Sequence, residues 1–399
     1  MEFLRIVFVI RSLPFHGLGG MEAIAWDLAR AFASRGHEVT VLTTPCPALR
    51  ASQDMEGVRI CCLEGPSGKY SRQWRRASEH FYTETLEGHA DVVLSVSAGA
   101  MSLAARRSKT DPAIYAVQAH GTAWGEIVSK LSTVSITGWI KAVLFSRHLV
   151  DDLGYRRFDA MISAGPRITN DLTRLPTRFI IGNLPVYEIS NGVDTDAFAF
   201  DPAERLRIRE QYGIPENAPV VLALSRLHAQ KGIQHALEGF ARARTQYPEL
   251  RFLVVGSGPH ESALREQADR LNLGTAVVFT GAVNRDRVGA LYSAADIFIF
   301  TSTRIEGLPL NVLEALASGL PVIVSRHIAI PGQRHQYPVD PQNPEEVGKA
   351  ISDAIARRDE MPRTCQLEET YWLTRSVDRY LQLFQTLRQA KEGRGSVGT

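Results

Sequence analysis

Short apolar runs alternate with longer amphipathic segments along the whole chain. Runs rich in Val, Ile and Phe predict buried strands, and apolar residues at helical spacing predict helices, such as residues 21–36, which Gly36 ends. The predicted strands of the first half are 5–10, 37–44, 91–97, 113–120 and 158–165. Those of the second half are 219–227, 250–258, 276–283, 296–303 and 320–326. Strands that alternate with helices in this way predict parallel sheets covered by helices.

The alternation occurs twice, on either side of a segment rich in turn-forming residues. We therefore predict an α/β protein with two Rossmann-like, doubly wound domains that face each other across a cleft. The predicted parts are an N-terminal domain at 1–188, a linker at 189–202, a C-terminal domain at 203–365, and a final helix with a flexible polar tail at 366–399. Ligands of such sheets bind beyond the carboxyl ends of the strands, so residues that follow each strand are the candidates for function.

Composition narrows the class of protein. With 399 residues, 44% of them apolar, the chain can bury two hydrophobic cores, and its net charge of +2 gives no general attraction to nucleic acid. The four cysteines lack C-x-x-C spacing, and the adjacent pair Cys61 and Cys62 lies in an apolar, strand-like run. The apolar start of the chain predicts a first strand rather than a signal peptide, because Glu2 and Arg5 interrupt it. No stretch has the length of a membrane span, and we expect a cytoplasmic protein.

Two acids lie in one short segment after a predicted strand. Glu306 precedes a helix that Pro309 is predicted to begin and Gly319 to end, and Glu314 lies inside that helix. The amides near Gly307 and Leu308 could receive an anion while both acids bind hydroxyls. The alternative is that acids near a helix start are simply favourable there.

Two cations follow the first strand of the second half. Arg226 and Lys231 could clamp a diphosphate, and they should lie at the same sheet edge as Gly307. As isolated basic residues they would instead be solvated surface. The convergence of cations and helix start at one edge favours an anion site.

The first half offers a glycine-rich turn and a histidine. Gly19 and Gly20 precede a helix, as in an anion site, but a tight turn without ligand would look the same, and the G-x-G-x-x-G spacing is absent. His120 follows a strand and is either structural or a contact to a ligand held by the other domain. Asp194 and Asp196 have D-x-D spacing but lie in the linker, where acids cap turns, so we predict no metal site.

In combination, these segments resemble the GT-B retaining glycosyltransferases of the large "group 1" (family 4-like) family. The resemblance runs almost from end to end. It is carried by GLGGMEAIAWDLARAFASRGHEVTVLTT, ISNGVDTDAF, SRLHAQKG and EGLPLNVLEALASGLPVI. It implies an enzyme that transfers a sugar from a UDP- or GDP-linked donor to a glycan, lipid-linked or small-molecule acceptor, without a metal, in polysaccharide or glycoconjugate biosynthesis.

The resemblance also implies roles for the candidate residues. Glu306 would contact hydroxyls of the donor sugar, Glu314 the ribose, and the amides of Gly307 and Leu308 the phosphate between them. Arg226 and Lys231 would stabilise the departing diphosphate, and His120 would contact the transferred sugar. Gly19 and Gly20 would line the phosphate and acceptor side, and the backbone near Ala282 and Val283 would meet the base. The final helix would cross back to brace the first domain.

One segment departs from the family pattern. Residues 327–341 carry Gly332 where family members usually have a glutamate, and the connection is shorter. This keeps open an epimerase or a non-catalytic nucleotide-sugar binder on the same fold. A Rossmann oxidoreductase has only the Gly-rich turns in its favour and lacks the dinucleotide fingerprint.

A basic and aromatic segment predicts peripheral contact with the inner face of the membrane. Residues 129–157 combine apolar and aromatic side chains with basic ones, as an interfacial helix does, and a basic-edged helix packed on its own domain is the alternative. The residues concerned are Trp139, Leu144, Phe145, Lys130, Lys141, Arg147, Arg156 and Arg157.

Overall fold

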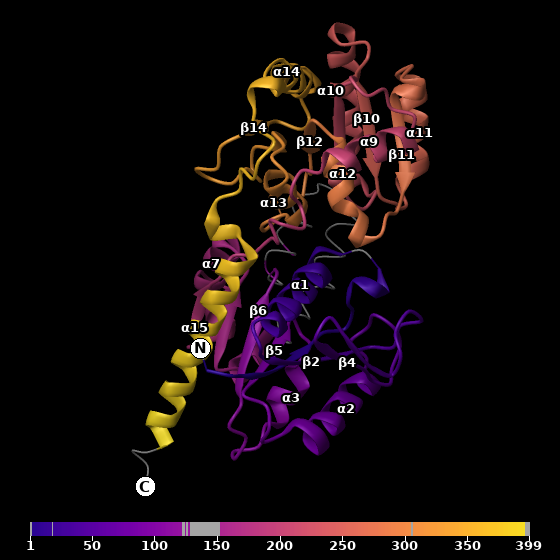
Figure 1. Ribbon diagram of the computed structural model, residues 1–399. Helices are drawn as coiled ribbons and strands as arrows, with labels where there is room; N and C mark the ends of the chain where they lie inside the picture. Colours follow the sequence, from indigo (N-terminus) through magenta and orange to yellow (C-terminus); the bar gives the residue numbers. More distant parts are fainter. Residues whose placement is uncertain are drawn as a thin grey trace. The chain divides into compact units, whose positions relative to one another are not determined.

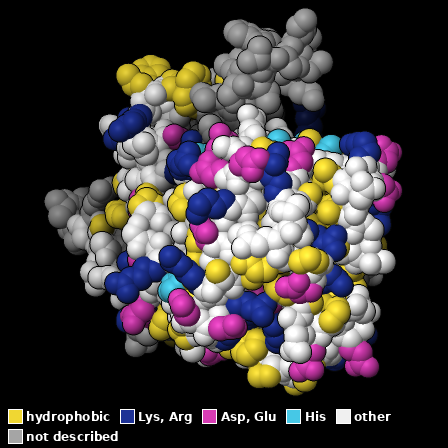
Figure 2. All heavy atoms as spheres, turned by 90° about the horizontal axis from the view of Figure 1, so that it is seen from above, with side chains coloured by type: hydrophobic (Ala, Val, Ile, Leu, Met, Phe, Trp, Pro, Cys, Tyr) yellow, Lys and Arg dark blue, Asp and Glu magenta, His cyan; other side chains and the backbone are white. Residues whose placement is uncertain are grey.

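The computed structural model describes residues 2–17, 19–121, 124, 127, 152–304 and 306–395. The chain divides into two compact units (Figure 1). Unit 1 comprises Met1–Gly192 and Leu373–Thr399, and unit 2 comprises Val193–Trp372. On the face drawn in Figure 2, basic and acidic side chains are interspersed, as expected from the near balance of charges.

Unit 1 is built on a sheet with the strand order β3-β4-β2-β1-β5-β6-β7-β8. All its neighbouring strands run parallel except β3 and β4. The strands are β1 (Arg5–Val9), β2 (Glu38–Thr43), β3 (Ser52–Met55), β4 (Val58–Cys62), β5 (Val92–Val96), β6 (Ile114–Ala119), β7 (Ala160–Ser163) and β8 (Val186–Glu188). The helices described in this unit are α1 (Gly20–Ser34), α2 (Arg72–Phe81), α3 (Met101–Arg106), α7 (Pro166–Thr173), α8 (Thr177–Ile181) and α15 (Leu373–Gly395).

The last helix, α15, belongs to the core of unit 1. Tyr380 and Phe384 pack their rings against Phe32 of α1, with ring centroids 6.1 Å apart in each pair. Gln118 of β6 donates to the hydroxyl of Tyr380 at 2.9 Å. The chain therefore returns from unit 2 to complete the hydrophobic layer on one face of the first sheet.

Unit 2 is built on a parallel sheet with the strand order β11-β10-β9-β12-β13-β14. This is the 3-2-1-4-5-6 order of a doubly wound fold, and the order reverses between β9 and β12. The strands are β9 (Val220–Leu224), β10 (Arg251–Val255), β11 (Val277–Gly281), β12 (Ile297–Phe300), β13 (Val322–Ser325) and β14 (Gln336–Val339). The helices described here are α9 (Pro202–Gln211), α10 (Ile233–Gln246), α11 (Glu261–Arg270), α12 (Val288–Ala294), α13 (Leu310–Ala317) and α14 (Pro344–Ala356).

The ten strands predicted from the sequence are all present, each inside its predicted range. The α/β class with two doubly wound sheets is confirmed. The strand-like run that contains Cys61 and Cys62 forms β4. The structure adds β3, β8 and β14, which are edge strands of three or four residues with mostly polar or partly exposed side chains. Such strands have little apolar pattern, because an edge strand buries less surface than a central one.

Candidate functional site

Two loops meet where the strand order of unit 2 reverses. Because β9 and β12 are neighbours, the residues that follow them leave the sheet side by side. Gly232, at the end of the first loop, has φ of +74°, and a Cβ there would lie 1.8 Å from the carbonyl oxygen of Thr301 in the second loop. Thr301 Oγ1 donates to the carbonyl of Gly232 at 2.8 Å. This close approach fixes one loop against the other and requires glycine at position 232.

The two loops bring Lys231 and Glu306 together. Lys231 Nζ lies 2.8 Å from Glu306 Oε1, and Ser302 Oγ donates to the same oxygen at 3.1 Å. The ammonium also lies 5.3 Å from the centroid of the Phe300 ring. Both charged side chains keep some exposure, 25% for Lys231 and 17% for Glu306, so a ligand from solvent can reach them.

Glu314 has a different setting, inside α13. Its side chain is only 2% exposed and forms an ion pair with Arg285. Its Oε2 accepts a hydrogen bond from the hydroxyl of Tyr292 at 2.9 Å. Burial and the neighbouring carboxylate raise the pKa of Tyr292 well above its ordinary value, so this hydroxyl stays a donor at neutral pH.

Arg285 and Tyr292, two partners of Glu314, were not among the residues predicted from the sequence. Arg285 follows β11, so the rule that residues after strands are candidates could have found it. Tyr292 lies in the middle of α12 and gives no signal in the sequence, because only folding brings it to Glu314.

The start of α13 lies at the same edge of the sheet. Asn311 Nδ2 donates to the carbonyl of Leu224, the last residue of β9, at 2.8 Å. The prediction that Pro309 is the first helical residue is wrong by one position: Pro309 has extended backbone and caps the helix, which begins at Leu310. Gly319, with φ of +74°, follows the end of the helix as predicted.

The other predicted residues of unit 2 follow strands of the same sheet. Arg226 lies in the loop after β9 with an exposed side chain, whereas Gly307 and Leu308 lie between β12 and α13. Ala282 and Val283 follow β11, two strands away from β9 in the sheet. The fold thus places the predicted cations, acids and amides of unit 2 along one carboxyl edge.

In unit 1, the glycine-rich turn begins α1. Gly19 is the residue before the helix and Gly20 is its first residue. The carboxylate of Glu22 folds back over this turn and accepts from Ser12 Oγ at 2.9 Å, and a Cβ on Gly19 would lie 2.0 Å from it. The positive end of the helix is therefore covered here by an anionic group of the chain itself.

His120 follows β6 of unit 1. Burial lowers its pKa to about 4, so the imidazole is neutral at pH 7. Its Nε2 atom is buried and has no hydrogen-bond partner among the residues that the structure describes. At pH 7 the imidazole can therefore take part in hydrogen bonds but not in a charge interaction.

Asp194 of the linker caps a turn, as predicted for acids at this position. Asp194 Oδ1 accepts from the backbone N–H groups of Asp196 and Ala197 at 3.2 and 3.3 Å. Over the described parts of the chain, no three His, Cys, Asp or Glu side chains gather in a way that could hold a metal ion.

The unusual segment at 327–341 forms a turn and the edge strand β14. Gly332 has φ of +79°, a backbone conformation that strains a residue with a side chain. Gln336 exchanges hydrogen bonds with the backbone of Ile330 at 2.9 and 2.8 Å. Glycine at this position is thus explained by the turn, which is held by the chain's own amides.

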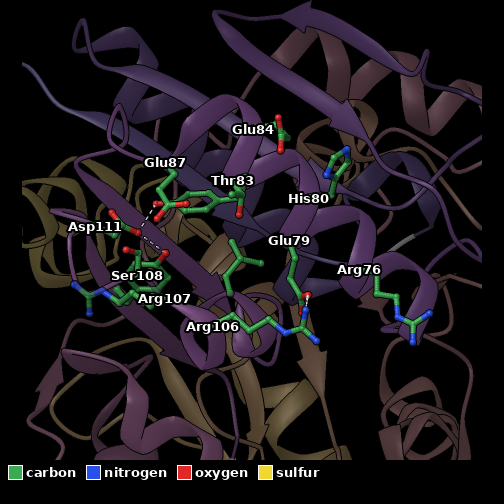
Figure 3. Close-up of a pocket in the computed structure, with 13 residues that line it drawn as sticks. Arg76, Glu79, His80, Thr83, Glu84, Glu87, Arg106, Arg107, Ser108 and Asp111 are labelled. Atoms are coloured by element: carbon green, nitrogen blue, oxygen red, sulfur yellow. Dashed lines mark hydrogen bonds and ion pairs between the residues drawn. The ribbon is translucent and has the colours of Figure 1, made fainter.

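A cavity of about 350 Å³ in unit 1 contains none of the predicted site residues (Figure 3). Its lining includes Asp111, which precedes β6, and Glu87, which precedes β5. It therefore lies at the amino ends of the strands, away from the edge where doubly wound sheets bind ligands. Glu79 and Arg106 form an ion pair in its wall at 2.9 Å (Figure 3).

Two protein families match the chain, and together they cover most of its length. Residues 18–197 match Glycosyltransferase Family 4, and residues 204–366 match the family described as Glycosyl transferases group 1. The chain belongs to the group 1 glycosyltransferases. The resemblance inferred from the motifs is therefore confirmed.

Curated relatives of this group 1 glycosyltransferase align over part of its length. It is 33% identical over 217 residues to the GDP-mannose-dependent alpha-(1-6)-phosphatidylinositol monomannoside mannosyltransferase of Mycolicibacterium smegmatis. The aligned region covers 50% of this chain and 56% of that protein, so it spans about half the length of the relative.

Solved structures confirm the GT-B fold of this group 1 glycosyltransferase. The sucrose-phosphate synthase of Thermosynechococcus elongatus matches with a TM-score of 0.76 at 20% identity, over 97% of this chain and 100% of that one. The Anabaena protein HepE, solved in complex with UDP and glucose, matches with a TM-score of 0.64 at 18% identity, over 98% of this chain and 99% of that one.

Proposed function

We propose that the protein is a retaining glycosyltransferase that transfers a sugar from a nucleoside-diphosphate sugar to a hydroxyl group of an acceptor. The observation that carries the proposal is the pair of acids on either side of the start of α13, one in contact with Lys231 and the other buried. A nucleotide sugar has the matching chemistry, with hydroxyls at both ends and a diphosphate between them.

In the proposed donor site, Lys231 forms an ion pair with Glu306. An arriving diphosphate offers Lys231 a stronger anion, and Glu306 is then released to accept hydrogen bonds from sugar hydroxyls. Arg226, exposed in the same loop, supplies a second cation for the diphosphate. The amides of Gly307 and Leu308 complete the phosphate contacts, and the backbone of Ala282 and Val283 faces the base.

The reaction breaks the bond between the sugar's anomeric carbon and the diphosphate oxygen. The acceptor oxygen attacks from the same face, which retains the configuration, and its proton passes to the departing phosphate. Lys231 and Arg226 stabilise the negative charge that develops on the diphosphate. His120, neutral at pH 7, accepts from or donates to a hydroxyl of the transferred sugar, and Gly19 and Gly20 of unit 1 line the phosphate and acceptor side.

The named relatives support a UDP or GDP donor and a glycan or lipid-linked acceptor, because one depends on GDP-mannose and acts on a phosphatidylinositol mannoside and another was solved with UDP. We propose no metal cofactor, since the cations of unit 2 supply the charge that a metal would. A role in polysaccharide or glycoconjugate biosynthesis follows from these classes of acceptor.

A hydrolysis screen tests the proposal. Group transfer to water, measured with UDP-, GDP- and ADP-sugars, should identify the donor and should be lost in Lys231→Met. Nucleotide-sugar binding without hydrolysis or transfer would instead indicate a non-catalytic binder. Tight binding of NAD without nucleoside-diphosphate binding would contradict the proposal.

We also propose that the protein acts at the inner surface of the membrane. Most of segment 129–157, on which this rests, lies outside the described residues, including Trp139 and Phe145. Arg156 is described, and its guanidinium donates to the carbonyls of Ile180 and Phe179 at 2.7 and 2.6 Å. Within the described ranges, no helix is both long and apolar enough to cross a bilayer. Co-sedimentation with phosphatidylglycerol vesicles tests the proposal, and an absence of salt-sensitive binding would refute it.

A further inference from the structure

Arg285 is a residue to which neither the motifs nor the comparisons give a role. We propose that it is a positioning residue for nucleotide binding, which holds the carboxylate of Glu314 aligned toward the ribose hydroxyls. This inference rests on the proposed function, in which Glu314 accepts hydrogen bonds from the ribose.

The contacts of Glu314 show why a positioning group is needed. One carboxylate oxygen pairs with Arg285 and the other accepts from Tyr292 at 2.9 Å, while only 2% of the side chain is exposed. A carboxylate so deeply buried is costly without a cation beside it.

Arg285 is itself held in place. Its guanidinium lies 5.1 Å from the centroid of the Phe198 ring, and that ring meets Tyr292 edge-on with centroids 5.8 Å apart. The backbone carbonyl of Phe198 accepts from Ser318 Oγ, beyond the end of α13, at 2.7 Å. The four side chains of Arg285, Glu314, Tyr292 and Phe198 thus form a closed cluster, in which the cation cannot turn without losing its contact with the ring.

The two side chains of the pair differ in exposure to solvent. Arg285 is 23% exposed whereas Glu314 is 2% exposed, so Arg285 forms the solvent side of the pair. Arg285 also lies two residues after Val283, whose backbone is proposed to face the base. A ribose next to that base therefore reaches Glu314 beside the guanidinium, whose planar, fixed donors set the orientation of the carboxylate.

Removal of ribose hydroxyls from the ligand tests the inference. We expect wild-type protein to bind UDP or GDP about 10 to 100 times more tightly than the matching 2′,3′-dideoxynucleoside diphosphate, as measured by calorimetry. In Arg285→Gln this preference should shrink about tenfold or more, with the affinity for the dideoxy ligand unchanged. Arg285→Lys should restore part of the preference, because it restores the charge without the planar fork.

Two further variants distinguish a positioning role of Arg285 from a role in folding. Arg287→Gln is the matched control, because Arg287 lies in the same 3₁₀ turn, is exposed, and donates from its guanidinium to the side chain of Gln211 at 3.3 Å. It should leave both affinities unchanged. Phe198→Leu removes the ring over which Arg285 lies but no charge, and it should reduce the ribose preference by a smaller factor, which keeps the inference testable where Arg285→Gln does not fold.

Three outcomes are distinguishable. Equal loss of both ligands in Arg285→Gln would overturn the inference and leave a structural role. A wild-type protein that binds the two ligands equally would show that Glu314 does not meet the ribose, and this overturns both that assignment and the inference. A protein that binds no nucleoside diphosphate would overturn the proposed function itself.

Discussion

Lys231 and Glu306 form an ion pair of 2.8 Å although 75 positions separate them in the sequence. Because Lys231 is paired with Glu306, removal of the Glu306 charge frees the cation for a diphosphate. Glu306→Gln should therefore bind bare UDP or GDP at least as tightly as wild type, but its kcat with the sugar donor should fall, since the sugar loses an orienting acceptor. Calorimetry and steady-state kinetics measure the two effects, and weaker binding of the bare diphosphate would contradict this assignment.

Glu314→Gln should give the opposite pattern. A hydrogen bond to a charged group contributes about 1.5–3 kcal/mol, so the affinity for bare nucleoside diphosphate should fall by about one to two orders of magnitude. KM for the donor should rise more than kcat falls, because the ribose is held equally in the ground and transition states. If both glutamine variants lose the same affinity for the bare diphosphate, the two acids have been assigned to the wrong ends of the ligand.

His120→Gln should lower kcat while leaving nucleotide affinity nearly unchanged, because His120 belongs to unit 1 and the proposed nucleotide site to unit 2. An unchanged kcat would remove His120 from the site.

The same histidine makes stability depend on pH. Its pKa is about 4 in the folded protein against 6.5 ordinarily, so between these values the unfolded chain binds a proton that the folded chain does not. The stability that the neutral His120 gives to the folded protein is fully present above pH 6.5, and it is lost as the pH falls from 6.5 toward 4. Urea unfolding at pH 7 and pH 5 should therefore show a smaller loss of stability on acidification in His120→Gln than in wild type.

Arg209 should be important for the stability of unit 2. Its side chain is 1% exposed and pairs with Asp296 at 2.9 Å, while Nε donates to the carbonyl of Ala294 at 3.0 Å. Burial lowers the pKa of Arg209, as expected for a cation removed from water. Arg209→Ala should reduce the free energy of unfolding by about 3–5 kcal/mol, because Asp296 keeps only Arg205 as an arginine partner and the buried carbonyls that Arg209 binds lose their donor.

The matched control for this experiment is Arg207→Ala in the same helix. Arg207 is exposed and pairs with Glu204 one turn away, so its removal should not change the denaturation midpoint. Comparable losses of stability in Arg209→Ala and Arg207→Ala would show that burial does not determine how much these arginines stabilise the protein.

Gly232→Ala should damage both stability and the donor site. The left-handed conformation costs a residue with a side chain about 1–2 kcal/mol, and at Gly232 the added Cβ would also collide with the carbonyl of Thr301. Gly213→Ala is the control, because Gly213 has φ of +63° but nothing within 4 Å of an added Cβ. Urea unfolding should show the smaller loss in Gly213→Ala, and weaker diphosphate binding should appear in Gly232→Ala alone, since residue 232 adjoins Lys231.

The sequence by itself determined the fold class, ten of the strands and the family. Strand formation depends on local runs such as residues 5–10 and 297–300, which are apolar because both faces of a parallel sheet are buried. The motif residues that follow these strands were also readable, because a parallel sheet brings carboxyl ends to one edge whatever the neighbour order. The short edge strands β3, β8 and β14 could not be predicted, since they bury too little to need an apolar pattern, whereas the edge strand β11 has an apolar run and was predicted.

Only the tertiary structure decided which charges meet. Glu306 and Glu314 have equal charge and lie eight positions apart, yet one pairs with a partly exposed lysine and the other is buried under Arg285. The difference arises because α13 directs Glu314 toward α12, whereas Glu306 lies in the loop against Lys231. Such partners are chosen by the packing of helices and by the neighbour order of strands, which depend on long-range contacts that no local pattern encodes.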